Sequence, residues 1–196
     1  DSGPGIPPER LATIFEKFAA GPAGAGGGTG LGLAYTKQVV ELWLEIGVDV
    51  VGFHTDIGTQ ENLMISPAKF RKYIKPLFAE IFGLVRQAGA LVSLSSDGNL
   101  LSIVDDLVEI GVSTHDPQFR ACGLDGIERK YKGKLCAIVD LDRQMLPYCT
   151  PADIHKQVRD VVERMYLPAG GLMLMGTCWD NNTPLANIAA LCAALE

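Results

Sequence analysis

The stretch "LVSLSSDGNLLSIVDDLVEIGVSTHDPQF", residues 91–119, decides the fold because it contains two short apolar runs joined by a helical pattern. The runs are "LVSLS" (91–95) and "VSTH" (112–115), and a polar loop follows each of them. Short apolar runs that alternate with longer helical patterns predict parallel strands, because a parallel neighbour is reached only through a crossover connection. This stretch therefore predicts one strand–helix–strand unit of an α/β fold.

The same alternation extends in both directions along the chain. Three further apolar runs, at 48–53, 135–139 and 171–175, are also separated by helical patterns. We therefore predict an α/β fold with a five-stranded parallel sheet that helices cover on both faces. A Ser or Thr cap followed by Pro marks several helix starts. These starts are Ser66-Pro67, Thr150-Pro151 and Thr183-Pro184.

The composition indicates a chain that can bury a core and that lacks a basic surface. Its 196 residues are 47% hydrophobic and carry a net charge of −6. Because no Lys/Arg cluster is present, we expect neither nucleic acid nor a membrane as a partner. No apolar run approaches the roughly 20 residues of a membrane-spanning helix, and no signal peptide opens the chain. The five cysteines form no C-x-x-C pair, which predicts reduced thiols in a cytoplasmic protein.

The loops that follow the predicted strands are rich in side chains that can bind or react. The carboxyl ends of parallel strands meet at one edge of a sheet, and ligands bind there in α/β proteins. The alternative is that these loops are polar only because they meet water. The candidate catalytic residues are His54, Asp56, Asp97 and His115. The candidate ligand-binding residues are Gln60, Asn99, Asp116, Asp140, Arg143 and Cys178.

Each group of candidates leaves more than one chemistry open. Asp97, Asp116 and Asp140 can hold a hard cation, or repulsion between them can raise the pKa of one carboxyl. His54 and His115 come at strand ends, where general bases often lie, but a histidine there is also common as a capping or solvent-facing residue. A single thiol such as that of Cys178 is more often a small buried hydrophobe than a ligand.

Residues 44–195 resemble the C-terminal half of the uroporphyrinogen decarboxylase superfamily, which also contains corrinoid and coenzyme M methyltransferases. Four segments carry this resemblance in order, and the resemblance implies half of a (β/α)8 TIM barrel. The family's first half, with an early catalytic aspartate and arginines for substrate carboxylates, has no counterpart in these segments. The segments are "GVDVVGFHTDIGTQENLMISPAKFRKYIKPLFAEIF" (47–82), "LSSDGNLLSIVDDLVEIGV" (94–112), "LDGIERKYKGKL" (124–135) and "TPLANIAAL" (183–191).

The resemblance implies a function as well as a fold. Decarboxylases of this superfamily remove acetate side chains from a porphyrinogen without a cofactor, and protein groups stabilise a cationic pyrrole. We therefore expect a catalytically incomplete half-barrel without a cofactor that binds a small anionic or tetrapyrrole-like ligand, with Asp56 and the C-terminal loops contributing. Methyltransferase members bind zinc through H-x-C-G-N. Zinc is not expected here, because Ser95 and Asp97 stand at the two ligand positions.

Residues 1–41 resemble a different family, the ATP-binding domain of sensor histidine kinases. Three boxes of that domain are matched in order by "DSGPGI" (1–6), "IFEKF" (14–18) and "GGTGLGLA" (27–34). The resemblance implies ATP with Mg²⁺ as an alternative ligand, because glycines let backbone amides approach phosphate at a helix N-terminus. The nucleotide-contacting residues that it implies are Asp1, Gly3, Gly5, Gly28, Gly30 and Gly32.

The two resemblances predict two domains, at 1–43 and 44–196. The first would consist of a short helix (11–18), a Gly-rich loop (19–30) and the start of a helix at 31–46 that spans the join. We expect that helix to face the core through an apolar stripe. The stripe consists of Leu31, Tyr35, Val39, Leu42 and Ile46. A further alternative is a chimera of two families that folds but has no activity.

The number of predicted strands has a consequence for assembly. A parallel barrel closes with about eight strands, so five strands leave two open edges. We therefore predict a homo-oligomer formed through these edges.

Overall fold

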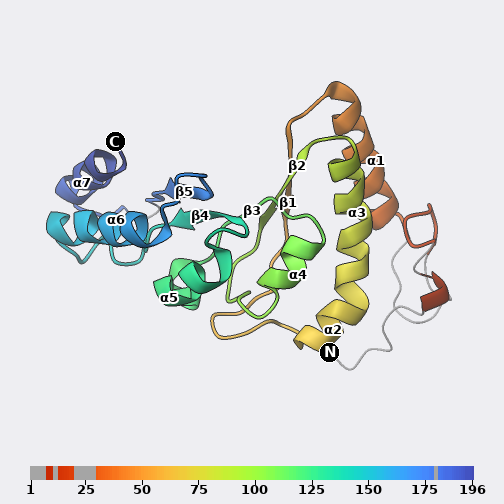
Figure 1. The fold of residues 1–196 in the computed structure, drawn as a ribbon, viewed down its shortest axis with the longest axis horizontal. Helices are drawn as coiled ribbons and strands as arrows, with labels where there is room; N and C mark the ends of the chain where they lie inside the picture. Colours follow the sequence, from red (N-terminus) through yellow and green to blue (C-terminus); the bar gives the residue numbers. More distant parts are fainter. Residues whose placement is uncertain (1–7, 11–12, 20–29, 179–180) are drawn as a thin grey trace.

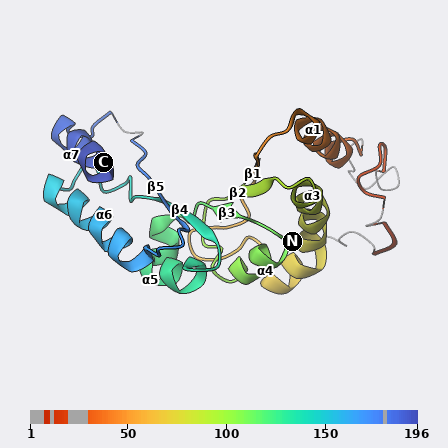
Figure 2. The same ribbon diagram turned by 45° about the horizontal axis from the view of Figure 1, so that its top comes forward.

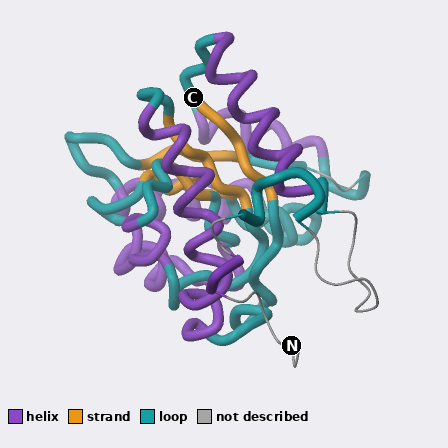
Figure 3. The backbone as a smooth tube through the Cα atoms, turned by 90° about the vertical axis from the view of Figure 1, so that its right-hand side faces the viewer, coloured by secondary structure: helices purple, strands orange, loops and turns teal. Residues whose placement is uncertain are grey.

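Each strand of the sheet pairs in parallel with the strand that follows it in the chain. The computed structural model describes residues 8–10, 13–19, 30–178 and 181–196. The strand order is β1-β2-β3-β4-β5, and the sheet is not closed into a barrel. The strands are β1 (Val50–His54), β2 (Leu91–Ser95), β3 (Thr114–His115), β4 (Cys136–Asp140) and β5 (Leu172–Met175). They form a single layer (Figures 1 and 3), which confirms the predicted α/β class with a five-stranded parallel sheet.

The helices lie along one side of this sheet. Crossovers between parallel strands are right-handed in about 98% of cases, so strands laid down in sequential order receive their helices on the same face. Figure 2 shows the helices following the outer side of the curved sheet from α1 to α7. The expectation of helices on both faces is therefore wrong. The helices are η1 (Pro8–Arg10), α1 (Gly32–Ile46), α2 (Pro67–Lys69), the π-helix η2 (Phe70–Ile74), α3 (Lys75–Gln87), α4 (Val104–Glu109), α5 (Phe119–Tyr131), α6 (Pro151–Met165) and α7 (Leu185–Leu195).

Side-chain burial along the strands follows the one-sided helix layer. Successive side chains of a strand point to opposite faces of the sheet. The side chains on the face that the helices cover are buried and belong to the hydrophobic core. They include Val51, Val92, Leu94, Ala137 and Val139. On the other face the exposed apolar side chains are Val50, Leu91, Met173 and Met175. The face of the sheet without helices therefore carries exposed apolar side chains. The two edge strands of the sheet are β1 and β5.

Most predicted helix ends are confirmed by their capping geometry. Gly47 ends α1 with a φ of 87°, and the Ser66 hydroxyl accepts a hydrogen bond from the Lys69 amide at the start of α2. Thr150 and Asp153 form a reciprocal capping box at the start of α6. The expectation for Thr183 is wrong, because α7 begins one residue later behind Pro184 and no side chain caps it.

The N-terminal part differs from the prediction where it is described. Residues 13–18 form turns and not the expected helix, although Ile14 and Phe15 are buried in the hydrophobic core. Most of the predicted Gly-rich loop, residues 20–29, lies outside the described residues. None of the helices in the described ranges is both long and apolar enough to cross a membrane.

Helix α1 packs on α3 through a different face from the one predicted. Ala34 and Val40 are buried, and Lys37 forms an ion pair of 3.7 Å with Glu80 of α3. The predicted stripe faces outward, since Tyr35 is 68% exposed and Ile46 is 78% exposed. The prediction failed because α1 carries apolar residues on two faces, and periodicity does not tell which face is packed.

The loops after β1 and β2 touch through two glycines. A side chain at Gly98 would place its Cβ 2.4 Å from the carbonyl carbon of Gly58, and Gly98 has a φ of +95°. A Cβ at Gly58 would in turn lie 2.8 Å from the carbonyl oxygen of Asp97. The Asn99 amide donates to the Thr59 carbonyl at 2.8 Å in the same contact. Only glycine allows this approach of the two backbones.

We predict that Gly98→Ala destabilises the protein more than Gly170→Ala does. Gly170 has a similar φ of +86° but nothing within 4 Å of its added Cβ, so its substitution costs only the left-handed strain, about 1 kcal/mol or 2–4 °C in Tm. Gly98→Ala adds the clash with Gly58 and should lower Tm at least twice as far. Thermal unfolding followed by circular dichroism measures both, and equal shifts would contradict the close contact.

Candidate functional site

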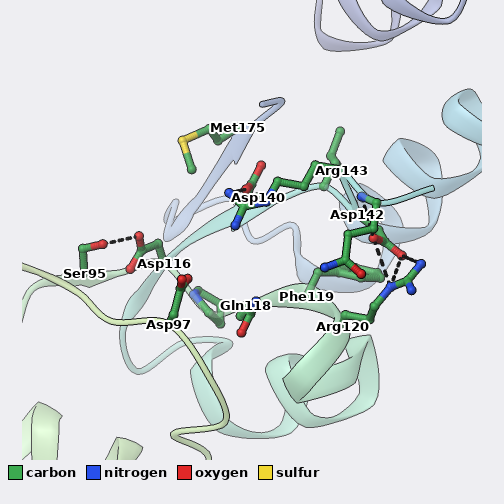
Figure 4. Close-up of a pocket in the computed structure, with 13 residues that line it drawn as sticks. Ser95, Asp97, Asp116, Gln118, Phe119, Arg120, Asp140, Asp142, Arg143 and Met175 are labelled. Carbon is green, nitrogen blue, oxygen red and sulfur yellow. Dashed lines mark hydrogen bonds and ion pairs between the residues drawn. The ribbon is translucent and has the colours of Figure 1, made fainter. Parts of the chain in front are cut away.

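A pocket of about 190 Å³ lies where four successive strands end (Figure 4). Four of the predicted site residues line it, namely Asp97, Asp116, Asp140 and Arg143. The remaining lining residues are Ser95, Pro117, Gln118, Phe119, Arg120, Leu141, Asp142, Gln144 and Met175. The structure therefore brings these four candidates together at the strand ends, and their role in ligand binding stays a prediction.

Two carboxylates of the pocket are held in place by hydrogen bonds. Asp116 accepts one from the Ser95 hydroxyl at 2.7 Å and one from the Ser96 amide at 3.3 Å. Asp140 accepts one from the Thr177 hydroxyl at 3.0 Å and faces Arg143 at 3.4 Å. Each donor lies on a neighbouring strand end or loop, so the sheet fixes where these oxygens lie.

The pKa of Asp140 is raised above its usual value. Burial is the largest cause, and the nearby negative charge of Asp116 acts in the same direction. The Thr177 hydroxyl and Arg143 oppose the shift without cancelling it. A carboxyl with a raised pKa holds its proton closer to neutral pH and is suited to proton transfer. The predicted repulsion between carboxylates is thus present, as a smaller contribution than burial.

The pocket as a whole is negatively charged. Four aspartates and two arginines line it, which leaves a formal charge of −2. Arg120 is engaged with Asp142 at 2.9 Å, and Phe119 and Met175 add apolar surface (Figure 4). This charge disfavours a purely anionic ligand and favours one that offers N–H donors.

Three predicted site residues connect loops to one another. An Asp56 oxygen accepts a hydrogen bond from the Asp97 amide at 3.0 Å. Gln60 donates to the Gln118 side-chain oxygen at 2.9 Å. Asn99 donates to the Ala121 carbonyl at 3.0 Å. These side chains lie at the rim as predicted, but none of them lines the pocket.

His115 does not face the rim, contrary to expectation. Its side chain is fully buried on the helix side of the sheet, where Nδ1 lies 3.0 Å from the Tyr131 hydroxyl and Nε2 has no hydrogen-bond partner. Burial lowers the pKa of His115 to about 4, so the ring is neutral at physiological pH. Successive side chains of a strand point to opposite faces, and His115 points to the face that packs on the helices. Its position at the end of a strand does not tell which face that is.

His54 and Cys178 are exposed but lie outside the pocket lining. His54 ends β1 in register with Ser95. Among the described residues, no group of three or more His, Cys, Asp or Glu side chains gathers as a metal site. The alternative that Asp97, Asp116 and Asp140 jointly hold a hard cation therefore finds no support in the geometry.

Gln118, Arg120 and Thr177 were not predicted from the sequence. Gln118 accepts from both the Gly98 amide, at 2.8 Å, and Gln60, so it joins three loops. Arg120 lies in the first turn of α5 and not in a loop, so the pattern of polar strand-end loops does not indicate it. Thr177 follows β5 directly, but a threonine there carries no signal of its own.

A second hollow, of about 570 Å³, lies at the N-terminus of α1. Gly30 precedes this helix with a φ of +67°, and its carbonyl accepts a hydrogen bond from the Phe18 amide at 3.2 Å. The hollow is lined by Lys17, Phe18, Leu31, Gly32, Ala34, Tyr35 and Gln38. Of the predicted nucleotide residues, Asp1, Gly3, Gly5 and Gly28 lie outside the described residues.

The N-terminal third of the chain matches a known family. Residues 1–66 match the family described as histidine kinase-, DNA gyrase B-, and HSP90-like ATPase. This match supports the resemblance of residues 1–41 to histidine kinases. It also runs past the predicted domain boundary at 43/44, through β1, and ends at Ser66, the N-cap of α2. It does not bear on residues 67–196, whose resemblance to the decarboxylase superfamily stays a prediction.

We predict that the stability of Asp140→Asn relative to wild type increases as the pH rises. Because the folded state raises the pKa of Asp140, the folded protein binds this proton more tightly than the unfolded chain does, and ionisation lowers the free energy of unfolding. The loss occurs as the pH rises through the interval between the two pKa values. Asn cannot ionise, so the Tm of the variant relative to wild type should be higher at pH 7 than at pH 4.

Asp160→Asn on α6, where Asp160 pairs with Lys156 outside the pocket, is the matched control. Differential scanning fluorimetry at the two pH values measures both variants. A relative Tm of Asp140→Asn that falls between pH 4 and pH 7 would contradict the buried-carboxyl explanation.

Proposed function

We propose that the strand-end pocket binds a small ring compound that carries N–H donors and a carboxylate, and that the half-barrel is a binding module without complete catalytic machinery. The observation that carries this proposal is the pair Asp116 and Asp140, fixed by their hydrogen bonds in one pocket beside Arg143 (Figure 4). Carboxylates accept from N–H groups, and an arginine side chain pairs with a ligand carboxylate.

The size of the pocket limits the ligand to about one ring. A volume of about 190 Å³ is below the 300–1,000 Å³ of most drug-sized ligand sites. A single pyrrole with short substituents matches this space better than a complete tetrapyrrole. The rest of a larger compound would have to lie on the open face of the sheet.

The two carboxyls would act differently on such a ring. Asp116 accepts from the Ser95 hydroxyl and the Ser96 amide, and its second lone pairs remain for a ligand N–H. Asp140 has the raised pKa and is the group from which a proton would be donated. The resemblance of residues 44–195 to decarboxylases that stabilise a cationic pyrrole supports this assignment.

The test is calorimetric titration with porphobilinogen, a single pyrrole that carries an amine and two carboxylates. We expect saturable binding, and we expect Asp116→Asn to weaken it about tenfold or more, because a hydrogen bond to a charged group contributes about 1.5–3 kcal/mol. Asp160→Asn is again the control and should bind as wild type does. No binding by the folded wild-type protein, or equal binding by Asp116→Asn, would overturn the proposal.

The second candidate function is ATP binding by the N-terminal region. The family match at residues 1–66 favours this candidate and does not favour the first. The hollow beside α1 adds a geometric reason, since Lys17 offers a cation for phosphate and Phe18 and Tyr35 offer aromatic rings for a base. The 15-residue helix α1 also presents its N-terminus there.

Titration with ATP and Mg²⁺ tests this candidate independently of the first. Lys17→Ala should weaken binding about tenfold, and Gly30→Val should abolish it because valine does not adopt the φ of +67°. Gly83→Ala in α3, where nothing lies within 4 Å of the added Cβ, is the control. Absence of heat from wild type, with intact thermal unfolding, would exclude the nucleotide candidate.

A further inference from the structure

Helix α1 carries two apolar faces that point in opposite directions. Ala34 and Val40 are buried on the face toward α3, whereas Tyr35, Leu42 and Ile46 are 68%, 51% and 78% exposed. Residues of an α-helix are offset by about 100° each, which puts these two sets on opposite sides of α1. In Figures 1 and 2 only η1 and the short segment 13–19 lie beyond α1 among the described residues, and α3 is the helix on which α1 packs.

The spacing of the outer face matches that of a helix–helix seam. Tyr35, Val39, Leu42 and Ile46 follow one another at intervals of four, three and four residues. This is the heptad spacing with which two helices interlock side chains. The spacing gives a narrow apolar stripe along one side of α1, a shape that suits a partner helix. We call these four residues the α1 seam.

The exposed area around the α1 seam is large enough for a specific interface. Phe18, Leu31 and Tyr35 line one hollow, so the exposed surface continues from the seam to Phe18, which is 73% exposed. Trp43 beside the seam is 44% exposed. An aromatic side chain buries about 150–250 Å², so these three rings alone offer several hundred Å², a substantial share of the roughly 800 Å² that each partner contributes to a standard interface.

The charges near the α1 seam select a second copy of the chain over a charged partner. The positions that flank the seam are Thr36, Gln38, Trp43 and Glu45, of which only Glu45 is charged. In an antiparallel two-fold arrangement Ile46 of one copy meets Tyr35 of the other, and the two Glu45 side chains lie at opposite ends. The seam is therefore complementary to itself and brings no like charges together.

We propose that α1 is the interface of a homodimer in which two copies pack antiparallel through the α1 seam. This assigns the predicted oligomer to a helix face and not to the open sheet edges. The interface is independent of the strand-end pocket, since none of the seam residues lines it. Tyr35 of the seam also lines the hollow of the ATP candidate, so the dimer and a nucleotide would compete for that surface.

The test is the mass of the full chain in solution, measured by sedimentation equilibrium from 1 to 100 µM. We expect wild type to reach the mass of two chains and Leu42→Glu to raise the dimer dissociation constant at least 100-fold. Leu42 is half exposed, so the variant should fold, and circular dichroism checks this. Leu185→Glu on α7, where Leu185 is 81% exposed, introduces the same charge elsewhere and should remain dimeric.

Two outcomes would overturn the proposal. One is a wild-type protein that stays monomeric at 100 µM. The other is a Leu42→Glu variant that dimerises as strongly as wild type, which would return the interface to the sheet edges. Porphobilinogen binding by Leu42→Glu provides a separate readout, because loss of the dimer should leave the strand-end pocket unchanged.

Discussion

The architecture depends on one constraint, the parallel pairing of every strand with its successor in the chain. Because each connection crosses over with the same hand, the helices gather on one side and the carboxyl ends of the strands gather at one edge. The core lies between the helices and the inward row of strand side chains, and the pocket lies at that edge. The open sheet face and the exposed outer side of α1 are the surfaces that this arrangement leaves without helices.

The chemistry of the pocket follows from partial burial of several carboxylates. Asp140 is deep enough for its pKa to rise, yet it keeps Thr177 and Arg143 as partners. Asp106 of α4, outside the pocket, shows the opposite balance. Burial pushes its pKa upward, but hydrogen bonds from Arg71 and Lys75 outweigh that effect and the pKa falls. Asp106 is therefore a fixed structural charge, whereas burial of Asp140 shifts its pKa in favour of the protonated form.

The sequence predicted the elements better than it predicted their orientation. Alternating apolar runs and helical patterns located each strand that the structure describes. Ser66 and Thr150 marked helix starts, because capping and periodicity are local effects. Which face of an element is packed is not local. His115 alternates into the core, and α1 packs through Ala34 and Val40, since the neighbouring elements decide which of two apolar faces is covered.

The same limit applies to the candidate site. Asp97, Asp116, Asp140 and Arg143 could be found from their place at strand ends, because parallel topology brings such ends together. Asp56, Gln60 and Asn99 have the same kind of position, but their side chains are used to join loops. Gln118 and Arg120 were missed because their importance arises from contacts across the edge of the sheet, which no spacing along the chain reveals.

The two-glycine contact between the loops after β1 and β2 has a thermodynamic consequence for recognition. With Gly58 against Gly98 and Gln118 holding both loops, the loop backbones reach their final conformation when the chain folds. A ligand then binds to a preorganised pocket. The entropy cost of binding is mainly the loss of the ligand's own translational and rotational freedom. Such a pocket should discriminate between ligands by shape, because its loops cannot adjust their conformation to a ligand of different shape.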